Sequence, residues 1–264
     1  MNLLKERPGL KLQHQLVSQR QKLYIANTFE SLTDREKCIV NSTKGKHAGG
    51  WLRAIPSSKY LRLNDTRMRM ALKLFMDLPI IPSDDGVCIV CKEHFEGTFA
   101  EHMLRCKCKD IRIHRHNAIR DDAYELFRQA GFSVSKEVND LIAKTQMRPA
   151  DILVYLFGTH GQDMAIDVSV VDPSSKDCWR KPLAAGEERE RSKRRKYAKD
   201  LTKQGILFNP LVFEAFGGIP RDSFKNVFER ATKRIKHMNR RTGQRLLPRR
   251  TGFRDSRSRC GVSM

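Results

Sequence analysis

The sequence predicts an α/β (α+β) fold in which helices flank a small mixed sheet. The stretch from Arg148 to Asp172 holds two apolar, β-branched runs around a turn with Gly158 and Gly161, a pattern typical of a β-hairpin. Helical periodicity lies on both sides of this stretch, and residues 206–216 form a further apolar run. The predicted order is therefore helix, strand, hairpin of two strands, helix and strand.

Residues 1–82 are predicted to form a helical N-terminal linker region, in which residues 1–21 suit a short basic helix or an arm. Thr33 and Glu36 have the spacing of a capping box and predict a helix start. A second helix is predicted from Asn64. Its apolar stripe is expected to pack in the core and consists of Met68, Ala71, Leu72, Phe75 and Met76.

Residues 83–110 hold cysteine and histidine residues with metal-ligand spacing. Cys88 and Cys91 form a Cys-x-x-Cys turn, and His102 and Cys106 are spaced i, i+4, which puts both on one face of a short helix. Three thiolates and one imidazole are the tetrahedral ligand set of structural Zn²⁺. We therefore predict a zinc knuckle, whose closed ligand set assigns it to folding or nucleic-acid contact rather than catalysis.

The seven cysteines as a whole favour a metal over disulfides. Their number is odd, and four of them cluster between Cys88 and Cys108, which predicts a reducing, intracellular compartment. His94 and Cys108 are alternatives to the second pair of ligands. A set of reduced cysteines without a metal is the purely structural alternative.

Residues 111–238 are predicted to hold the main core. A helix over 113–130 carries an apolar stripe and ends at Gly131, and the alternating residues 132–138 predict the strand that starts the sheet. Three polar residues of this helix are candidates to lean into a site, although such side chains are more often solvated: His116, Asp122 and Glu125.

The hairpin carries two acids at unusual places. Asp151 opens its first strand, and Asp167 interrupts the apolar run of its second. A buried carboxylate is costly unless it is paired or binds a metal. If the hairpin pairs the two acids near one end, they form a hard-oxygen site for Mg²⁺. The structural alternative is that Asp151 ends the turn at Pro149 and Asp167 lies on a solvated face.

Residues 187–204 are predicted to form one long helix that ends at Gly205. Acids crowd its start and bases follow, which suits the helix dipole. Lys193, Lys196 and Tyr197 fall within about one turn of each other. Such a basic run is also typical of a solvated face or a nuclear-import signal. A last helix follows the strand over 206–216, and the Arg-rich tail 239–264 is predicted to be disordered.

The charge balance predicts a polyanionic partner. The formal net charge is +21, and the residues from Arg189 onward hold 22 Lys and Arg against 6 Asp and Glu. Nucleic acid is the simplest partner for such a basic half. No secretory signal is visible, and no apolar run approaches the ~18 residues of a membrane helix. We therefore expect a nuclear protein without membrane contact.

These motifs together resemble the restriction-like endonuclease domain at the C-terminus of site-specific non-LTR retrotransposon proteins, within the PD-(D/E)XK nuclease superfamily. The resemblance covers roughly residues 45–235. It rests on the zinc knuckle upstream of the core, the Arg148-Pro149-Ala150-Asp151 motif, Asp167 on the next strand, and the lysine-rich helix with Lys193 and Tyr197. It implies a metal-dependent endonuclease of retrotransposon origin that nicks target DNA by phosphodiester hydrolysis.

The resemblance also implies roles for individual residues. Asp151, Asp167 and the Val168 carbonyl would bind catalytic Mg²⁺ or Mn²⁺, which activates water and stabilises the charge on the attacked phosphate. Lys196, preferred over Lys193, would position that water or neutralise the transition state. Tyr197 would orient the lysine or contact the backbone.

The sequence departs from the family pattern at two positions, and the second, the missing lysine, favours a decayed nuclease. Ala150 separates Pro149 from Asp151, and Ser169 stands where the superfamily places its lysine. No Tyr-x-Asp-Asp signature of a reverse transcriptase is present. The chain is therefore expected to be a detached C-terminal piece of such an element or a descendant of one, with a reverse transcriptase or a retroelement ribonucleoprotein as a candidate partner.

Two functions of another class compete with the nuclease. The first is a catalytically decayed, zinc-stabilised nucleic-acid-binding protein. The second is a basic RNA-binding accessory protein in which Asp151 and Asp167 are structural, so that neither binds Mg²⁺ or Mn²⁺. Retained nucleic-acid binding without metal-dependent cutting distinguishes the first from the nuclease, and a metal titration distinguishes the second.

Overall fold

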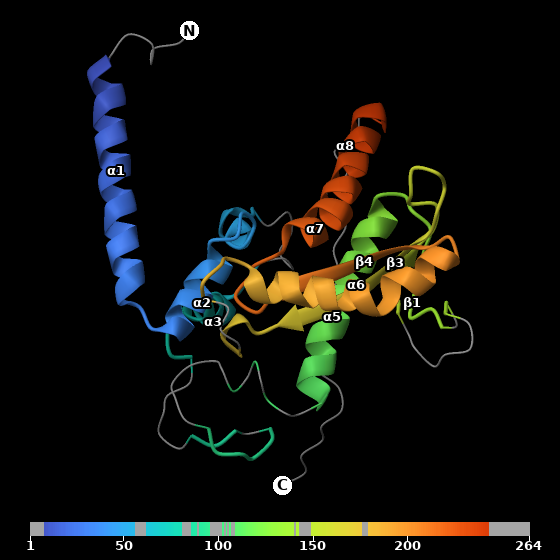
Figure 1. The fold of residues 1–264 in the computed structure, drawn as a ribbon, viewed down its shortest axis with the longest axis horizontal. Coiled ribbons are helices and arrows are strands. Elements are labelled where there is room, and N and C mark those ends of the chain that lie inside the picture. The colour runs from blue at the N-terminus through green and yellow to red at the C-terminus, as the bar shows by residue number, and fades with distance from the viewer. Residues whose placement is uncertain are drawn as a thin grey trace.

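The computed structural model describes residues 8–55, 62–80, 86–88, 90–95, 102, 104, 106, 109–139, 141–142, 149–175 and 179–242. Its centre is a four-stranded sheet between helices (Figure 1). The α/β class predicted from the sequence is therefore confirmed. None of the described helices is long and apolar enough to cross a bilayer.

The sheet consists of β1 (Val134–Lys136), β2 (Ile152–Val154), β3 (Met164–Val171) and β4 (Leu207–Glu214), in that spatial order. The first three strands are antiparallel, and β4 lies parallel to β3. The predicted hairpin is thus present as β2 and β3, with Ile152 opposite Ile166. The parallel partner is possible because a helix joins β3 to β4 across one face of the sheet.

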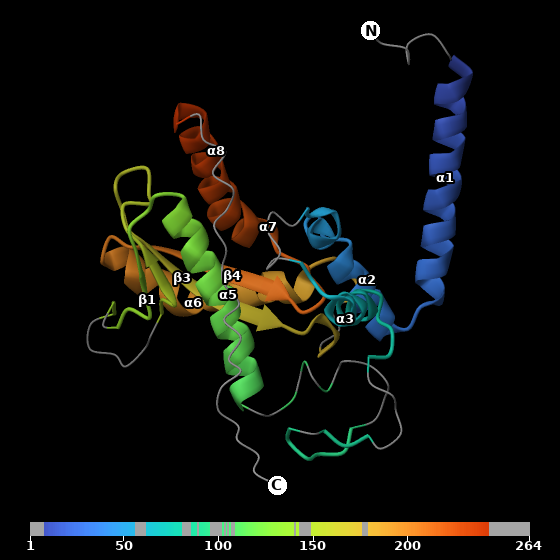
Figure 2. The same cartoon turned by 180° about the vertical axis from the view of Figure 1, so that it is seen from behind.

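Side-chain alternation along the strands divides the core into two layers. On one face, α5 (Lys109–Gln129) and the C-terminal helices pack against Ile152, Ile166 and Val168. On the other face, α6 (Ala184–Lys203) packs through Tyr197 and Leu201 against Leu153, Ala165 and Phe208. Figures 1 and 2 show the two sides, with α6 in front of the sheet in the first view and α5 and α8 in front in the second.

Local signals place the ends of the core helices as predicted. Gly131 (φ 72°) follows α5, and Gly205 (φ 73°) follows α6. Both are in the left-handed region that favours glycine after a helix. The last helical region begins with α7 (Arg221–Ser223), continues as a π-helical segment (Phe224–Glu229) and ends as α8 (Arg230–Thr242). Residues 239–242 are therefore helical, and the rest of the predicted disordered tail lies outside the described residues.

Buried polar contacts fix α6 to the outer edge of β4. The Ser223 hydroxyl accepts a hydrogen bond from the Val212 N–H (3.0 Å), and the Ser223 N–H donates to Glu190 of α6 (2.9 Å). The Gly186 N–H donates to Glu214 at the end of β4 (3.0 Å). Burial raises the pKa of both Glu190 and Glu214. These contacts set the rotation of α6, and therefore which of its bases face the sheet.

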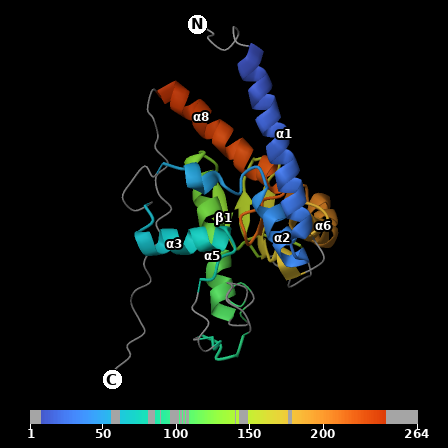
Figure 3. The ribbon, with the colours of Figure 1, turned by 90° about the vertical axis from the view of Figure 1, so that its left-hand side faces the viewer.

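The N-terminal region contains α1 (Pro8–Ser31), α2 (Asp34–Thr43), a short 3-10 helix (Gly50–Arg53) and α3 (Asp65–Phe75). The capping box predicted at Thr33 and Glu36 is confirmed at the start of α2. The expected arm is a helix of 24 residues that stands away from the sheet (Figures 1 and 3). A further short helix (Pro173–Ser175) follows β3 and contacts α2.

The prediction that the α3 stripe packs in the core is wrong. No residue of α3 is buried, and Met68 and Met76 are exposed. The ring of Phe75 makes an edge contact with Trp51 at 5.9 Å between ring centroids. Helical periodicity shows which side chains share one face of a helix, but it does not show what that face packs against. It therefore did not reveal that α3 lies beside the sheet domain rather than within it.

Candidate functional site

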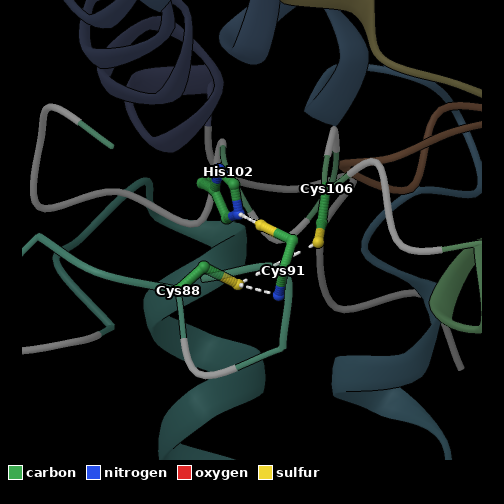
Figure 4. Close-up of side chains that lie close together, drawn as sticks. All are labelled: Cys88, Cys91, His102 and Cys106. Atoms are coloured by element: carbon green, nitrogen blue, oxygen red, sulfur yellow. Dashed lines mark hydrogen bonds between the residues drawn. The ribbon is translucent and has the colours of Figure 1, made fainter. Parts of the chain in front are cut away.

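Four side chains predicted to hold a metal come together in one cluster. The ligand atoms of Cys88, Cys91, His102 and Cys106 all lie within 4.8 Å of one another (Figure 4). The Sγ atoms of Cys88 and Cys106 are 4.0 Å apart, and the Cys91 Sγ lies 3.2 Å from the His102 Nε2. Tetrahedral Zn²⁺ with 2.3 Å bonds to sulfur separates two thiolates by about 3.8 Å. The cluster could therefore hold a metal ion, and its dimensions suit structural zinc.

A short hairpin turn places the first two cysteines. Val87 and His94 form an antiparallel bridge, and the Cys88 N–H donates to the Glu93 carbonyl (2.9 Å). His94 is therefore part of the hairpin bridge and not of the four-residue cluster. The alternative ligand Cys108 lies outside the described residues.

Two thiols of the cluster have pKa values shifted in opposite directions. Backbone N–H groups of Cys91 and Val90, together with neighbouring side chains, lower the pKa of the Cys88 thiol to about 6. Cys91 accepts a hydrogen bond from the backbone of Glu93, which favours its thiolate, but burial and the adjacent sulfur atoms raise its pKa to about 11. Of these two thiols, Cys88 is therefore the one that ionises more readily. Thiolates are the form that binds metals.

The two hairpin acids lie side by side at the start of β2. Asp167 lies between Ile166 and Val168, so alternation directs its side chain to the sheet face that α6 covers, and Asp151 immediately precedes Ile152. The Asp151 carboxylate accepts a hydrogen bond from the Val168 N–H at 2.6 Å. The Asp151 side chain, rather than a backbone carbonyl, therefore accepts this hydrogen bond and holds the start of β2 against β3.

Asp167 is buried and has a lysine as its counter-charge. Its side chain is 8% exposed, and the Lys193 Nζ donates to Oδ1 at 3.0 Å. The same Nζ lies 2.8 Å from Oδ2, close enough for an ion pair but outside hydrogen-bonding geometry, so Oδ2 accepts no hydrogen bond from the described residues. Burial raises the pKa of Asp167, although Lys193 opposes the shift.

Helix α5 contributes a histidine to this group. The His116 Nε2 lies 3.2 Å from Asp151 Oδ1. This contact raises the pKa of His116, while burial lowers it to a smaller extent. Of the other candidates on α5, Glu125 pairs with Arg128 instead, at 3.0 Å. His116 continues the apolar stripe of Ile119, Ala123 and Phe127 by its spacing. This spacing could have identified His116 in the sequence as a residue that faces the sheet.

The structure places Lys193, and not Lys196, beside the acid pair. Lys193, Tyr197 and Leu201 are spaced i, i+4, i+8, so the two buried apolar residues direct Lys193 toward the sheet. Lys196 is exposed, and its ammonium lies 4.9 Å from the centre of the Tyr197 ring. Lys193 is therefore the α6 lysine that contacts the acid pair.

Tyr197 is a residue of the core and does not lie on the surface, where it could contact a nucleic-acid backbone. It is 6% exposed, and its ring packs edge-on against Phe208. Its face also lies 5.6 Å from the Lys193 ammonium. The ring therefore lies near both lysines, and the role of Tyr197 in orienting a lysine stays a prediction.

Helix α5 links the metal cluster to the acid pair. It begins at Lys109, three residues after Cys106, and His116 lies two turns further along. Arg115 donates to the Leu104 carbonyl at 3.4 Å and is half-buried. The family motif residue Arg148 lies outside the described residues, whereas Pro149 and Ala150 are buried.

Comparison with known proteins adds no family to these observations. A scan against protein-family models finds no match, and a search of curated protein sequences finds none either. The function therefore has to be argued from the two clusters and from the surface around them.

Proposed function

We propose that the chain is a DNA endonuclease of the restriction-like type that requires Mg²⁺ or Mn²⁺. The observation that carries this proposal is the convergence of Asp151, Asp167 and Lys193 on one face of an α–β–β–β–α–β core. Two carboxylates and a lysine gathered at the start of β2 are the groups that metal-assisted phosphodiester hydrolysis needs. The basic second half of the chain supports DNA as the substrate.

The acid pair fits a hard divalent cation. Asp167 is a buried carboxylate whose Oδ2 lies 2.8 Å from the Lys193 ammonium, and Asp151 is its neighbour across the strand pair. The Val168 carbonyl points to the same side of β3 as the Val168 N–H, beyond the start of β2. Asp151, Asp167 and this carbonyl would hold Mg²⁺, which supplies a more acidic water and stabilises charge on the phosphate.

The remaining groups of the site have roles that follow from their charge. Lys193 would neutralise Asp167 before the cation binds and would then be free to contact a phosphate oxygen. His116 would hold the second oxygen of Asp151 and so fix the direction in which that carboxylate points. Cys88, Cys91, His102 and Cys106 would hold structural Zn²⁺, because a closed set of four ligands leaves no position for a substrate.

Plasmid nicking tests the proposal directly. Purified protein is incubated with supercoiled plasmid in Mg²⁺, in Mn²⁺ and in EDTA, beside the Asp151→Ala/Asp167→Ala variant. We expect metal-dependent nicking by the wild type, none by the variant, and the same zinc content in both. Full cleavage by the variant would exclude the acid pair as the active site.

A decayed nuclease that binds nucleic acid is the second candidate function. Ser169, which stands where the superfamily has its lysine, is buried on the acid face of β3. DNA binding that weakens at high salt, with no nicking under any metal condition, would support this candidate. Retrotransposon origin, a reverse transcriptase partner and a nuclear location stay predictions of the resemblance.

A further inference from the structure

The bases of α6 fall into groups with different partners. Lys193 pairs with Asp167, and Arg194 donates to Asn209 of β4 at 3.1 Å. On the flank of α6 far from the acid pair, Arg191 and Arg195 pair with Glu188 at 2.8 and 3.1 Å. That flank is therefore compensated by its own acids, and these two arginines lower the pKa of Glu188.

The flank of α6 beside the acid pair is different. It carries four exposed bases that we call the α6 row: Arg189, Lys196, Lys199 and Lys203. Each residue turns a helix by about 100°, so the four lie within a sector of about 80°. Among the described residues, Arg189, Lys196 and Lys199 have no ion-pair partner, although the Lys196 ammonium lies over the Tyr197 ring, and Lys203 pairs with Asp200 at 3.1 Å. The positive charge of the row is therefore not fully neutralised by neighbouring acids.

The row lies directly beside the candidate active site. Lys193 is four residues after Arg189 and three before Lys196, so it is a neighbour of both on the helix surface. The axial distance from Arg189 to Lys203 is about 21 Å, because fourteen residues rise by about 1.5 Å each. This is the length of about six base pairs of DNA at 3.4 Å each.

Three bases of α8, the other long C-terminal helix, contact groups of the protein. In α8, Arg230 donates to the Phe157 carbonyl at 2.8 Å and covers the ring of that residue. Arg234 covers the Phe132 ring, and Lys233 pairs with Glu229 at 2.8 Å. Arg230 and Arg234 therefore contact the core and Lys233 pairs within its own helical region, whereas Arg189 and Lys199 of the α6 row have no ion-pair partner among the described residues.

We infer that the α6 row is a contact surface for the phosphate backbone of a DNA duplex. The row would hold the backbone along α6, so that one phosphate lies at Asp151 and Asp167 while its neighbours contact Lys196, Lys199 and Arg189. Phosphate contacts position a duplex without reading its sequence. This inference rests on the proposed function for its choice of DNA, and it assigns Lys196 to binding rather than to chemistry.

Two variants with the same loss of charge test the inference. Lys196→Gln/Lys199→Gln removes two bases from the row, and Arg191→Gln/Arg195→Gln removes two bases from the compensated flank. Each is made in the full chain with Asp167→Asn, so that cleavage cannot interfere, and residues 243–264 are the same in both. Binding to a labelled 30-base-pair duplex is measured by fluorescence anisotropy from low to high salt without Mg²⁺.

The slope of log K against log salt distinguishes the outcomes. Each lost phosphate contact reduces the slope by about 0.9, so the row variant is expected to reduce it by nearly 2. The control variant is expected to reduce it by less than half as much. Equal reductions in both, or none in the row variant, would overturn the inference and leave the row as a solvated face. Competition by polyglutamate as effective as by DNA would also overturn it, in favour of an acidic protein partner.

The experiment remains informative if the proposed nuclease activity fails. A decayed nuclease would show the slope difference without any nicking, and an active nuclease with another binding surface would show nicking without the difference. Where nicking occurs, the row variant in the active background is expected to raise KM for the plasmid and leave kcat unchanged. A loss of kcat alone would contradict a binding role.

Discussion

The two clusters of this protein differ in how the chain assembles them. The cysteine and histidine cluster comes from one segment between Cys88 and Cys106, and a hairpin turn and a helical spacing bring its four ligands together. The acid group draws on three elements, with His116 from α5, Asp151 and Asp167 from the hairpin, and Lys193 from α6. A site of the first kind is encoded by local spacing, whereas a site of the second kind depends on packing.

The clusters also differ in the chemistry that they can perform. The first offers soft ligands in a closed set, which suits a structural cation. The second combines two carboxylates, a lysine and a histidine; burial raises the pKa of Asp167, and the contact with Asp151 raises the pKa of His116. Perturbed carboxyl and histidine groups gather at functional sites. The comparison therefore supports our proposal of a structural role for the first cluster and a functional role for the second, and substitutions can test each role.

The largest expected effect is the loss of a metal ligand. Cys106→Ser is expected to remove the bound zinc and to unfold the segment around residues 86–106, because structural Zn²⁺ contributes roughly 10 kcal/mol to small zinc domains. Zinc content by a colorimetric chelator and the thermal midpoint measure this. Asp167→Asn is the control and should keep its zinc. A Cys106→Ser protein with full zinc and an unchanged midpoint would show that the cluster is not the zinc site.

A smaller effect separates the two lysines of α6. Lys193→Ala is expected to reduce the nicking rate about 100-fold, the usual result of removing one group that stabilises transition-state charge. Lys196→Ala is expected to retain the rate at saturating DNA and to bind DNA more weakly. Rates under single-turnover conditions with excess protein measure the first effect. A larger loss of nicking rate in Lys196→Ala than in Lys193→Ala would instead indicate Lys196 as the catalytic lysine, although Lys193 is the one that contacts Asp167.

The smallest effect concerns the pairing of His116 with Asp151. The contact raises the folded-state pKa of His116 above its ordinary value of 6.5. Its stabilising contribution is therefore fully present below pH 6.5 and is lost as the pH rises through the raised folded-state value. The thermal midpoint of wild type is expected to exceed that of His116→Asn at acidic pH, and the two should converge at alkaline pH without Mg²⁺. A difference independent of pH would mean that the contact does not depend on the charge of His116.

Much of the architecture follows from local rules in the sequence. The capping box at Thr33, the glycines at 131 and 205 and the Cys-x-x-Cys turn each act over a few residues, so the chain encodes them without reference to the rest of the fold. Two apolar, β-branched runs around a glycine turn likewise predicted the hairpin that carries the two acids. These features depend on backbone dihedrals and side-chain spacing, which a sequence displays directly.

Only the tertiary structure decided which groups meet at the acids. The rotation of α6 is set by Tyr197 and Leu201 in the core and by Glu190 at the edge of β4, and this rotation turns Lys193 inward and Lys196 outward. The position of His116 depends on how α5 crosses the sheet, and the exposure of the α3 stripe depends on where that helix docks. Each outcome is a balance between burial and contact over residues far apart in the chain, which no local pattern contains.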